Sequence, residues 1–393
     1  MDDTIESPGP GRMISRRAFL RTSGCLALAT LGTGLLAACG QAAQPAAKPT
    51  EAPKPAAPAA QPVATSAPPP PKPTEAAKPT AAAQVAPAKT ESVSMRLGWL
   101  ANAQYAGDFA ALDKGFYKER GIDLRIDPGG PNIDPVSLTA SGSNTIGNVA
   151  SIAAMFLARS NGVPVKAFGA ALQRHPFAFI SLKQSNINSP KDFVGKKIGI
   201  QATARPLIDA VIAKYDLPRD QVQIQVIGAD TVPLVTGQVD VITGWVIDAP
   251  QMAAVGPDAN PLLLWDMGIR LYAFTYFTSD DVLKSKPDML ASFLAASARG
   301  WEWAADNPEE ATDISLKYGK DLKRDMELET WKRETPFLWS DKTKESGWGW
   351  MEPQVWDDAI QVYSGLGLMK APITSQDAMT QDILKRVESR PKR

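Results

Sequence analysis

The sequence predicts an α/β protein with two lobes, and two observations carry this prediction. From residue 93 to residue 272, expected strands, in which hydrophobic residues alternate, are interspersed with expected helices, in which they recur at helical spacing. Such alternation is typical of helices that cover a mostly parallel sheet. A second unit of the same kind begins near Ser189. We therefore expect two α/β lobes, the second inserted into the first, with a ligand cleft between them.

The first unit opens with a strand at Val93 to Leu100, where hydrophobic residues alternate. Residues 106–120 place Phe109, Leu112 and Phe116 on one helical face, and Gly121 is a suitable helix stop. The next expected elements are, in order, a strand at 122–126, a helix at 135–140, a strand at 144–148, a helix at 151–161, and strands at 163–170 and 178–182.

The second unit begins with Ser189 as a helix N-cap, Pro190 at the first helical position and Asp192 in the first turn. Strands follow at 197–201, 222–227, 239–243 and 262–265, with a helix at 206–215. From Tyr272 the chain returns to a strand and then to long helices. We therefore assign residues 91–183 and 273–393 to the first lobe and residues 184–272 to the second.

The N-terminal 38 residues have the pattern of an export signal. Arg16-Arg17 precede an apolar run, which is the twin-arginine pattern, and the run ends in Leu-Ala-Ala-Cys39, which resembles the lipobox of bacterial lipoproteins. The alternative is a short membrane anchor, but the run of about 14 residues is shorter than the roughly 20 that span a bilayer. We expect acylation at Cys39 and a location on the extracytoplasmic face of the cell membrane. Met13 is an alternative start.

Residues 39–90 are rich in alanine and proline and contain no aromatic residue. Such a segment buries too little apolar surface to offset the entropy lost on ordering, so we expect a disordered tether. Cysteines occur only at positions 25 and 39, so the body has neither a disulfide nor a thiol nucleophile.

Charge and histidine content exclude several classes of protein. The body carries 33 basic and 37 acidic residues, which does not suit a nucleic-acid binder. His175 is the single histidine, so a histidine-based metal site or catalytic triad is not expected. Asp108, Asp248 and Asp266 lack the pairing that would indicate a hydrolase. We expect no enzyme activity, no metal and no cofactor.

Several segments of the body resemble one family. The segments are Gly98-Trp-Leu-Ala-Asn-Ala-Gln-Tyr-Ala-Gly107, Ala111-Leu-Asp-Lys-Gly-Phe-Tyr117, Gly121-Ile-Asp-Leu124, Ser189 to Gly199, and Val235 to Asp240. They are similar to the thiamine-pyrimidine-synthesis-like (NMT1/THI5-like) solute-binding proteins, the group that includes SsuA- and ThiY-type proteins. The resemblance implies a type II periplasmic-binding fold. It also implies that the protein delivers a small molecule to the permease and ATPase of an ABC importer. We expect a monomer. Eukaryotic members that are enzymes use a histidine and a cysteine-rich motif, and this body has no cysteine.

Ligands of open α/β sheets bind at the carboxyl ends of strands, so the residues that follow each expected strand are the candidate contacts. They are Trp99, Asn102, Tyr105, Asn148, Gln173, Gln201, Thr203, Arg205, Trp245, Asp248 and Tyr272. Ser151, His175, Phe274 and Tyr276 also follow expected strands; His175 is equally well explained as a packing residue. Trp301, Trp303, Trp331 and Trp339 lie in helical sequence, where packing is the expected role.

Aromatic faces and amide side chains suit a flat heterocycle, and riboflavin is the ligand we favour. The family also includes binders of a thiamine pyrimidine precursor. Those proteins tend to carry proline and histidine where this chain has Ala101 and Tyr105. An anion such as an alkanesulfonate or nitrate is a third possibility, because Arg205 precedes an expected helix; Arg205 could equally form a salt bridge that closes the lobes. A tethered sensor that kept the binding fold is the alternative class of function.

Overall fold

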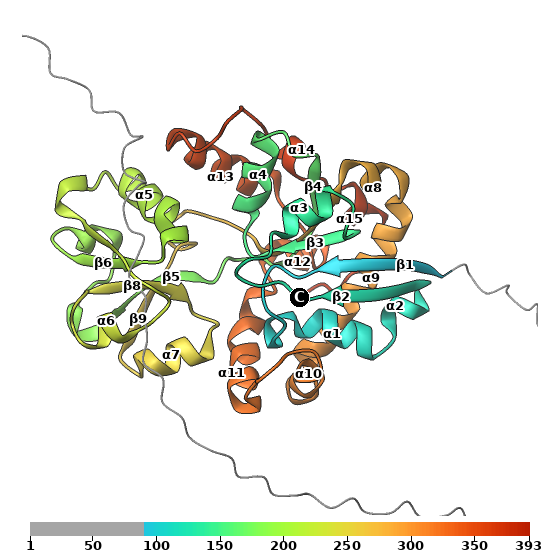
Figure 1. The fold of residues 1–393 in the computed structure, drawn as a ribbon, viewed down its shortest axis with the longest axis horizontal. Coiled ribbons are helices and arrows are strands. Elements are labelled where there is room, and N and C mark those ends of the chain that lie inside the picture. Colours follow the sequence, from blue (N-terminus) through green and yellow to red (C-terminus); the bar gives the residue numbers. More distant parts are fainter. Residues whose placement is uncertain (1–89) are drawn as a thin grey trace, which may run out of the picture. The chain divides into compact units, whose positions relative to one another are not determined.

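The computed structural model describes residues 90–393, which form two five-stranded sheets flanked by helices (Figure 1). The expected signal segment, Cys39 and the expected tether up to residue 89 lie outside the described residues. Within the described part, no helix combines the length and hydrophobicity that crossing a bilayer requires.

The first sheet has the strand order β2-β1-β3-β10-β4. β1 is parallel to β2 and β3, whereas β10 is antiparallel to both of its neighbours. The sheet is therefore mixed: β10 runs opposite to the other four strands, which all run in the same direction. Its strands are β1 (Glu91–Arg96), β2 (Ile122–Asp127), β3 (Ile146–Val149), β4 (Val165–Leu172) and β10 (Ala273–Ser279).

The second sheet has the order β7-β6-β8-β5-β9 and is mixed in the same way, since β5 is antiparallel to β8 and β9. Its strands are β5 (Phe177–Leu182), β6 (Lys197–Ile200), β7 (Gln223–Val226), β8 (Val241–Trp245) and β9 (Ala259–Leu263). The expected first lobe reaches to residue 183. β5 pairs in the second sheet instead, so the boundary lies before residue 177.

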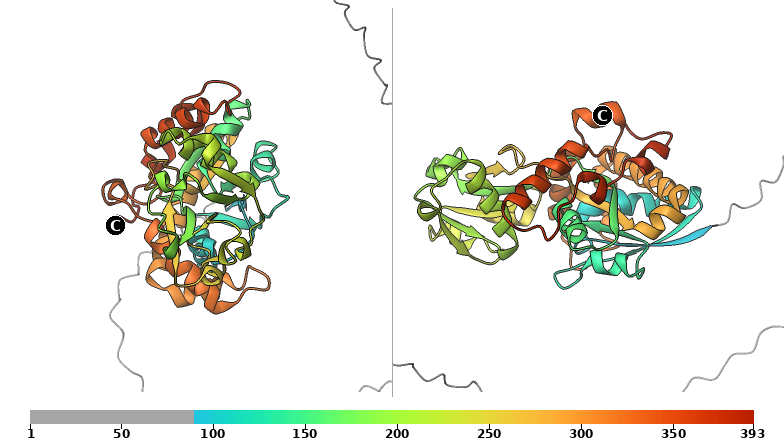
Figure 2. Two further views of the ribbon diagram at one scale, coloured as in Figure 1. Left: turned by 90° about the vertical axis from the view of Figure 1, so that its left-hand side faces the viewer. Right: turned by 90° about the horizontal axis from the view of Figure 1, so that it is seen from above.

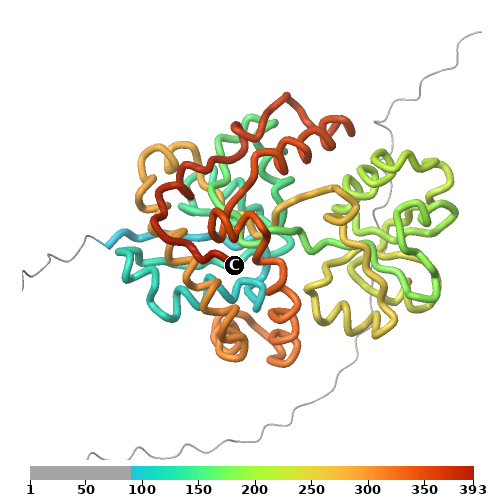
Figure 3. Tube along the Cα trace, turned by 180° about the vertical axis from the view of Figure 1, so that it is seen from behind, coloured from blue at the N-terminus to red at the C-terminus, as the bar shows by residue number. Residues whose placement is uncertain are grey.

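The chain crosses between the sheets twice, once at residues 173–176 and once at residues 264–272 (Figure 3). The two crossing segments are hydrogen-bonded to each other, because the backbone N–H of His175 donates to the carbonyl oxygen of Leu271 at 3.0 Å. The sequence does not indicate that the two crossings form one unit, since the bonded residues lie far apart along the chain.

Two helices that are distant in sequence, α1 (Ala106–Asp113) and α9 (Pro287–Asp306), pack tightly on one face of the first sheet. Glycines permit this approach. A Cβ atom at Gly107 would lie 2.2 Å from the Trp301 ring, and one at Gly300 would lie 2.3 Å from the Gly107 carbonyl oxygen. The helix expected over residues 106–120 is broken at Gly115, whose φ is 77°, and resumes as α2 (Phe116–Glu119).

The opposite face of the first sheet is covered by α3 (Pro135–Ala140), and α4 (Ile152–Ser160) packs on β4 (Figure 2). The second sheet carries α5 (Arg205–Lys214), α6 (Val232–Val235) and α7 (Ala249–Val255). The remaining helices belong to the C-terminal part of the chain: α8 (Asp280–Ser285), α10 (Pro308–Ser315), α11 (Arg324–Glu334), α12 (Asp341–Ser346), α13 (Pro353–Gly365), α14 (Ser375–Ala378) and α15 (Asp382–Arg386).

Candidate functional site

Four aromatic rings form a continuous series across the junction of the two lobes, and we call them the aromatic chain (His175, Trp245, Phe274 and Tyr105). Trp245 ends β8 of the second lobe, and its ring centroid lies 4.8 Å from that of His175 and 5.9 Å from that of Phe274. Phe274 in turn lies 5.0 Å from Tyr105, which ends the 3-10 helix η1 (Ala103–Tyr105) of the first lobe. Side chains of both lobes thus meet at one place.

Phe274 is held in a conformation that few side chains adopt. Its φ is 47°, in the left-handed region, which is a true outlier for a bulky residue. A backbone of this kind costs of order 1–3 kcal/mol and persists where the surroundings impose it, most often at functional sites. Phe274 is the second residue of β10 and follows the second crossing segment, so the strained residue is the one whose ring joins the two lobes.

His175 is a neutral, packed side chain. Burial alone lowers the pKa of its imidazole to about 3, and its Nδ1 atom accepts a hydrogen bond from the backbone N–H of Phe177 at 3.2 Å. The imidazole therefore carries no charge at neutral pH and serves as one more flat ring in the aromatic chain.

Unpaired polar side chains are buried at the junction, and the first two are those of Asn148 and Tyr105. The amide of Asn148 is fully buried, and within the described residues neither its oxygen nor its nitrogen is paired. The Tyr105 hydroxyl is also buried and in the same part of the chain makes no hydrogen bond of good geometry, although the backbone of Trp99 and Gly98 faces its oxygen. The Tyr105 phenol lies beside the backbone of Gly98, and a Cβ atom at Gly98 would lie 2.9 Å from the backbone carbonyl oxygen of Asn148. Unpaired buried polar groups are rare in folded proteins, so packing alone does not account for these side chains.

A buried carboxyl group, that of Asp108 on α1, lies next to these side chains. Tyr276, which pairs with Asn148 across the sheet, donates to Asp108 at 2.8 Å, and Tyr117 donates at 3.2 Å. Burial raises the pKa of Asp108 to about 7, although the hydrogen bond from Tyr276 and the others act in the opposite direction. The Trp301 indole N–H donates to the Tyr276 hydroxyl at 2.8 Å. The hydrogen bonds around Asp108 are thus connected to a buried side chain of α9.

One face of α11 lines the junction with Glu327, Thr330 and Glu334, which share a face because of their helical spacing. The carboxylate of Glu327 accepts from the backbone N–H of Ala103 at 2.7 Å. The hydroxyl of Thr330 accepts from the backbone N–H of Ala249 in the second lobe at 3.3 Å. Glu334 is fully buried, and neither of its oxygens has a partner in residues 90–393.

Among the residues expected from the sequence, Tyr105, Asn148 and Trp245 lie at the junction as described. Trp99 follows β1 and is 44% exposed. Gln201 is half-buried and Thr203 is exposed, both just before α5.

Four expected contacts use their polar atoms within the fold. Gln173 donates to the carbonyl oxygens of Ala170 and Trp350 and accepts from Ser340. The hydroxyl of Tyr272 accepts from the backbone N–H of Glu352 at 3.0 Å. The other two cap helices: Asn102 caps η1, and Asp248 caps α7. These bonds leave polar atoms of Tyr272, Asn102 and Asp248 available, so the four residues stay predicted contacts.

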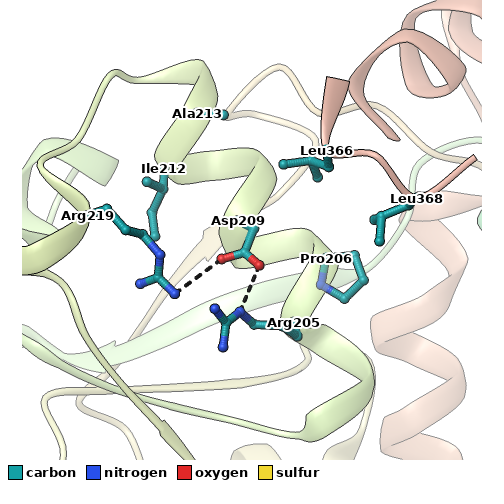
Figure 4. Close-up of a pocket in the computed structure, with 8 residues that line it drawn as sticks. All are labelled: Arg205, Pro206, Asp209, Ile212, Ala213, Arg219, Leu366 and Leu368. Atoms are coloured by element: carbon teal, nitrogen blue, oxygen red, sulfur yellow. Dashed lines mark hydrogen bonds and ion pairs between the residues drawn. The ribbon is translucent and has the colours of Figure 1, made fainter. Parts of the chain in front are cut away.

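Arg205 points into an open groove of about 330 Å³ between α5 and the end of α13, which contains no ring of the aromatic chain (Figure 4). Its guanidinium pairs with Asp209 at 2.7 Å, and Arg219 approaches the same carboxylate at 3.5 Å. Arg205 thus forms a salt bridge, but not the lobe-closing one that the sequence suggested. That pair joins residues of one lobe and does not close the lobes.

Sequence analysis missed Glu334. The α11 segment is strongly polar, and a glutamate at its end is normally solvated. Only the packing of α11 between η1 and α7 makes this face an interior one. In the described residues, no group of three histidine, cysteine, aspartate or glutamate side chains is placed to hold a metal ion.

Comparison with known proteins agrees with this architecture. The family model described as "NMT1/THI5 like" matches residues 102–311, which is more than half of the chain. The chain belongs to the NMT1/THI5-like family. The periplasmic aliphatic sulphonate-binding protein SsuA of Escherichia coli has the same fold, with a TM-score of 0.58 at 14% identity, over 74% of this chain and 92% of that one. This likeness shows the α/β periplasmic binding protein fold.

Two curated relatives of this NMT1/THI5-like chain are binding proteins. The riboflavin-binding protein RibY of Chloroflexus aurantiacus is 28% identical over 85% of this chain and 93% of its own length. The formylaminopyrimidine-binding protein of Halalkalibacterium halodurans is 25% identical over 74% of this chain and 90% of its own length. The family also includes enzymes, since other relatives are synthases of 4-amino-5-hydroxymethyl-2-methylpyrimidine phosphate.

Proposed function

We propose that the protein is the extracytoplasmic solute-binding component of an ABC importer and captures a flat heterocyclic vitamin, with riboflavin as the favoured ligand. The observation that carries the proposal is the aromatic chain beside the unpaired amide of Asn148 and hydroxyl of Tyr105. Rings stack on a flat ligand and contribute roughly 1–3 kcal/mol each. An amide and a hydroxyl read the donors and acceptors along its edge.

The lobes must separate slightly to admit such a ligand. A ring in van der Waals contact on both faces needs about 7 Å between its two neighbours. Trp245 and Phe274 have ring centroids 5.9 Å apart and lie on opposite sides of the junction. The two crossing segments, joined at His175 and Leu271, are the natural hinge for this movement. Hinge closure around a ligand is a common device in two-lobed binding proteins.

The relatives support a heterocycle over other ligands. One is named for riboflavin and another for a formylaminopyrimidine, and both ligands are flat nitrogen heterocycles. The formylaminopyrimidine is thus the second candidate ligand. Arg205 had suggested an anion, but its charge is offset by Asp209 and it lies in a groove apart from the aromatic chain.

The export pattern supplies the location in this proposal. Acylation of Cys39 would attach the protein to the cell membrane, and the tether would let a monomeric body reach its permease and ATPase. A Cys39→Ser variant should leave the membrane fraction while the body keeps its affinity for ligand. If the variant protein stays with the membranes, the proposed anchor is wrong.

The ligand is tested by titrating the purified protein with riboflavin, a formylaminopyrimidine and taurine, following flavin fluorescence and the Tm. Riboflavin should bind with quenching at one equivalent. Asn148→Ala should weaken binding at least about tenfold, since it removes hydrogen bonds that the ligand needs. Asn161→Ala, whose amide caps α4 at the surface, is the control and should bind normally. Binding of taurine alone would refute the proposal.

A further inference from the structure

Glu334 is the polar side chain of the junction that is most costly to the folded protein. Its carboxyl group is fully buried at the end of α11, and in the described chain neither oxygen accepts or donates a hydrogen bond. Burying a carboxyl group without a partner costs more than burying a neutral amide. The fold does not use this group to hold anything together, so a structural role does not account for it.

The groups that face Glu334 are acidic. Asp108 on α1 and the Tyr105 phenol on η1 are the titratable groups that interact with it electrostatically. Burial, and then the charge of Asp108, raises the pKa of Glu334 well above its usual range. Two carboxyl groups that interact in apolar surroundings do not both ionise at neutral pH. Farther along the same face of α11, Glu327 faces Asp248 of the second lobe, which adds no positive charge.

The basic side chains near this end of α11 are occupied elsewhere. Arg174, in the first crossing segment, donates to the Pro336 carbonyl oxygen at 3.3 Å and lies over the Phe337 ring. Arg333, the neighbour of Glu334, pairs with Glu329 at 2.8 Å. Within the described residues Glu334 takes part in no ion pair, so a proton is the cheapest way to neutralise it.

Building on the proposed function, we infer that Glu334 contacts the ligand as a neutral carboxylic acid and selects an uncharged ring edge on which a hydrogen-bond donor and an acceptor are neighbours. The acid O–H donates and the C=O accepts, so one group satisfies both atoms of the edge. The Asn148 amide offers the same pair of functions, and α11, which carries Glu334, packs on η1, which carries Tyr105.

This inference defines the class of ligand. The imide edge of a flavin and the amino edge of an aminopyrimidine each place a donor beside an acceptor. A sulfonate offers acceptors only, so it leaves the acceptor oxygen of Glu334 unpaired, and the arginines near this end of α11 in the described chain, Arg174 and Arg333, are engaged elsewhere. The site therefore takes neutral heterocycles and rejects anions.

The test compares riboflavin with 3-methylriboflavin, which lacks the imide N–H, on wild-type protein and on Glu334→Leu. Wild type should bind riboflavin at least about tenfold more tightly than 3-methylriboflavin. The methyl group replaces the imide N–H, which is the donor to the carbonyl oxygen of Glu334. Glu334→Leu should bind riboflavin more weakly and lose most of this preference. Glu334→Gln, which keeps a donor and an acceptor, should keep the preference. An equal preference in wild type and Glu334→Leu would overturn the inference.

A second measurement does not depend on ligand. Since the carboxyl group is unpaired in the empty protein, Glu334→Leu should raise the Tm of the ligand-free protein by about 2–4 °C. Glu329→Leu on the same helix, which removes an exposed ion pair, is the control and should leave the Tm nearly unchanged. A fall in the Tm of Glu334→Leu would show that the carboxyl group stabilises the fold, against the inference.

The outcomes separate the two ideas. Wild-type protein that binds taurine and no heterocycle overturns the proposed function together with this inference. Wild-type protein that binds riboflavin, with Glu334→Leu unchanged in affinity and preference, overturns the inference alone.

Discussion

Replacing Asp108 by asparagine should change how the stability of the protein depends on pH. Asp108 is fully buried, and its pKa is raised from 3.8 to about 7, chiefly by burial. The folded protein therefore holds this proton at pH values where the unfolded chain has released it. Stability is full below the unfolded pKa of about 4 and is lost as the pH rises through about 7. The side-chain amide of the Asp108→Asn variant cannot ionise, so this loss should disappear.

The size of the effect follows from the two pKa values. A difference of about three pKa units corresponds to about 4 kcal/mol in the free energy of unfolding once both forms have ionised. Between about pH 4.5 and pH 7.5 the part that is lost is about 3 kcal/mol. Asp108→Asn also removes the charge that helps to raise the pKa of Glu334. The stability that Glu334 loses with rising pH is then smaller in the variant, which adds to the difference from wild type.

The assay is urea unfolding of wild type and Asp108→Asn at both pH values. The free energy of unfolding of the variant minus that of wild type should be about 3 kcal/mol more favourable at pH 7.5 than at pH 4.5. Asp313→Asn is a surface control: its pKa is lowered by the hydrogen bond from Arg324, so its pH dependence should have the opposite sign. If the difference between Asp108→Asn and wild type is the same at both pH values, Asp108 is ionised in the folded protein and the reasoning fails.

Three further predictions concern ligand stacking on Trp245, helix packing at Gly107 and the salt bridge of Arg205. Trp245→Ala should weaken riboflavin binding roughly ten- to hundredfold in a fluorescence titration, since a stacked ring contributes roughly 1–3 kcal/mol. The control is Trp303→Ala, which removes a half-buried ring under Lys114 and should bind riboflavin as wild type does. Equal losses of affinity in the two variants would contradict the role of Trp245. Gly107→Ala should lower stability by about 1–3 kcal/mol in thermal unfolding because its methyl group meets Trp301, whereas Gly365→Ala in open space on α13 should stabilise slightly. Arg205→Ala should leave riboflavin affinity within about twofold of wild type, and a loss above about tenfold would place the ligand near α5.

Sequence patterns predicted most elements of the fold because hydrophobic period and turn residues are local signals. The helix expected at 135–140 and the strand expected at 197–201 agree with α3 and β6 within one residue. Strand direction was not predictable in this way. β10 runs antiparallel between β3 and β4, and this pairing depends on contacts between residues more than 100 positions apart.

The site was predictable only in part, for a physical reason. Asn148 and Trp245 follow strands, and strand ends meet at one edge of a sheet, so position alone indicated them. Whether a polar side chain is free for a ligand depends on its neighbours. Gln173 looks as suitable as Asn148 in the sequence, but Ser340 and Trp350 occupy its amide. Glu334 becomes interior only because α11 packs between the two lobes.

The position of β10 has a consequence for synthesis of the chain. β10 is a central strand of the first sheet, yet all five strands of the second sheet, residues 177–263, precede it in the sequence. A chain emerging from the ribosome therefore contains every strand of the second sheet while β3 and β4 still lack their common neighbour. Because unpaired strand edges promote aggregation, the second lobe should fold first, and chains interrupted before residue 279 should carry a finished second lobe beside an open, aggregation-prone first one.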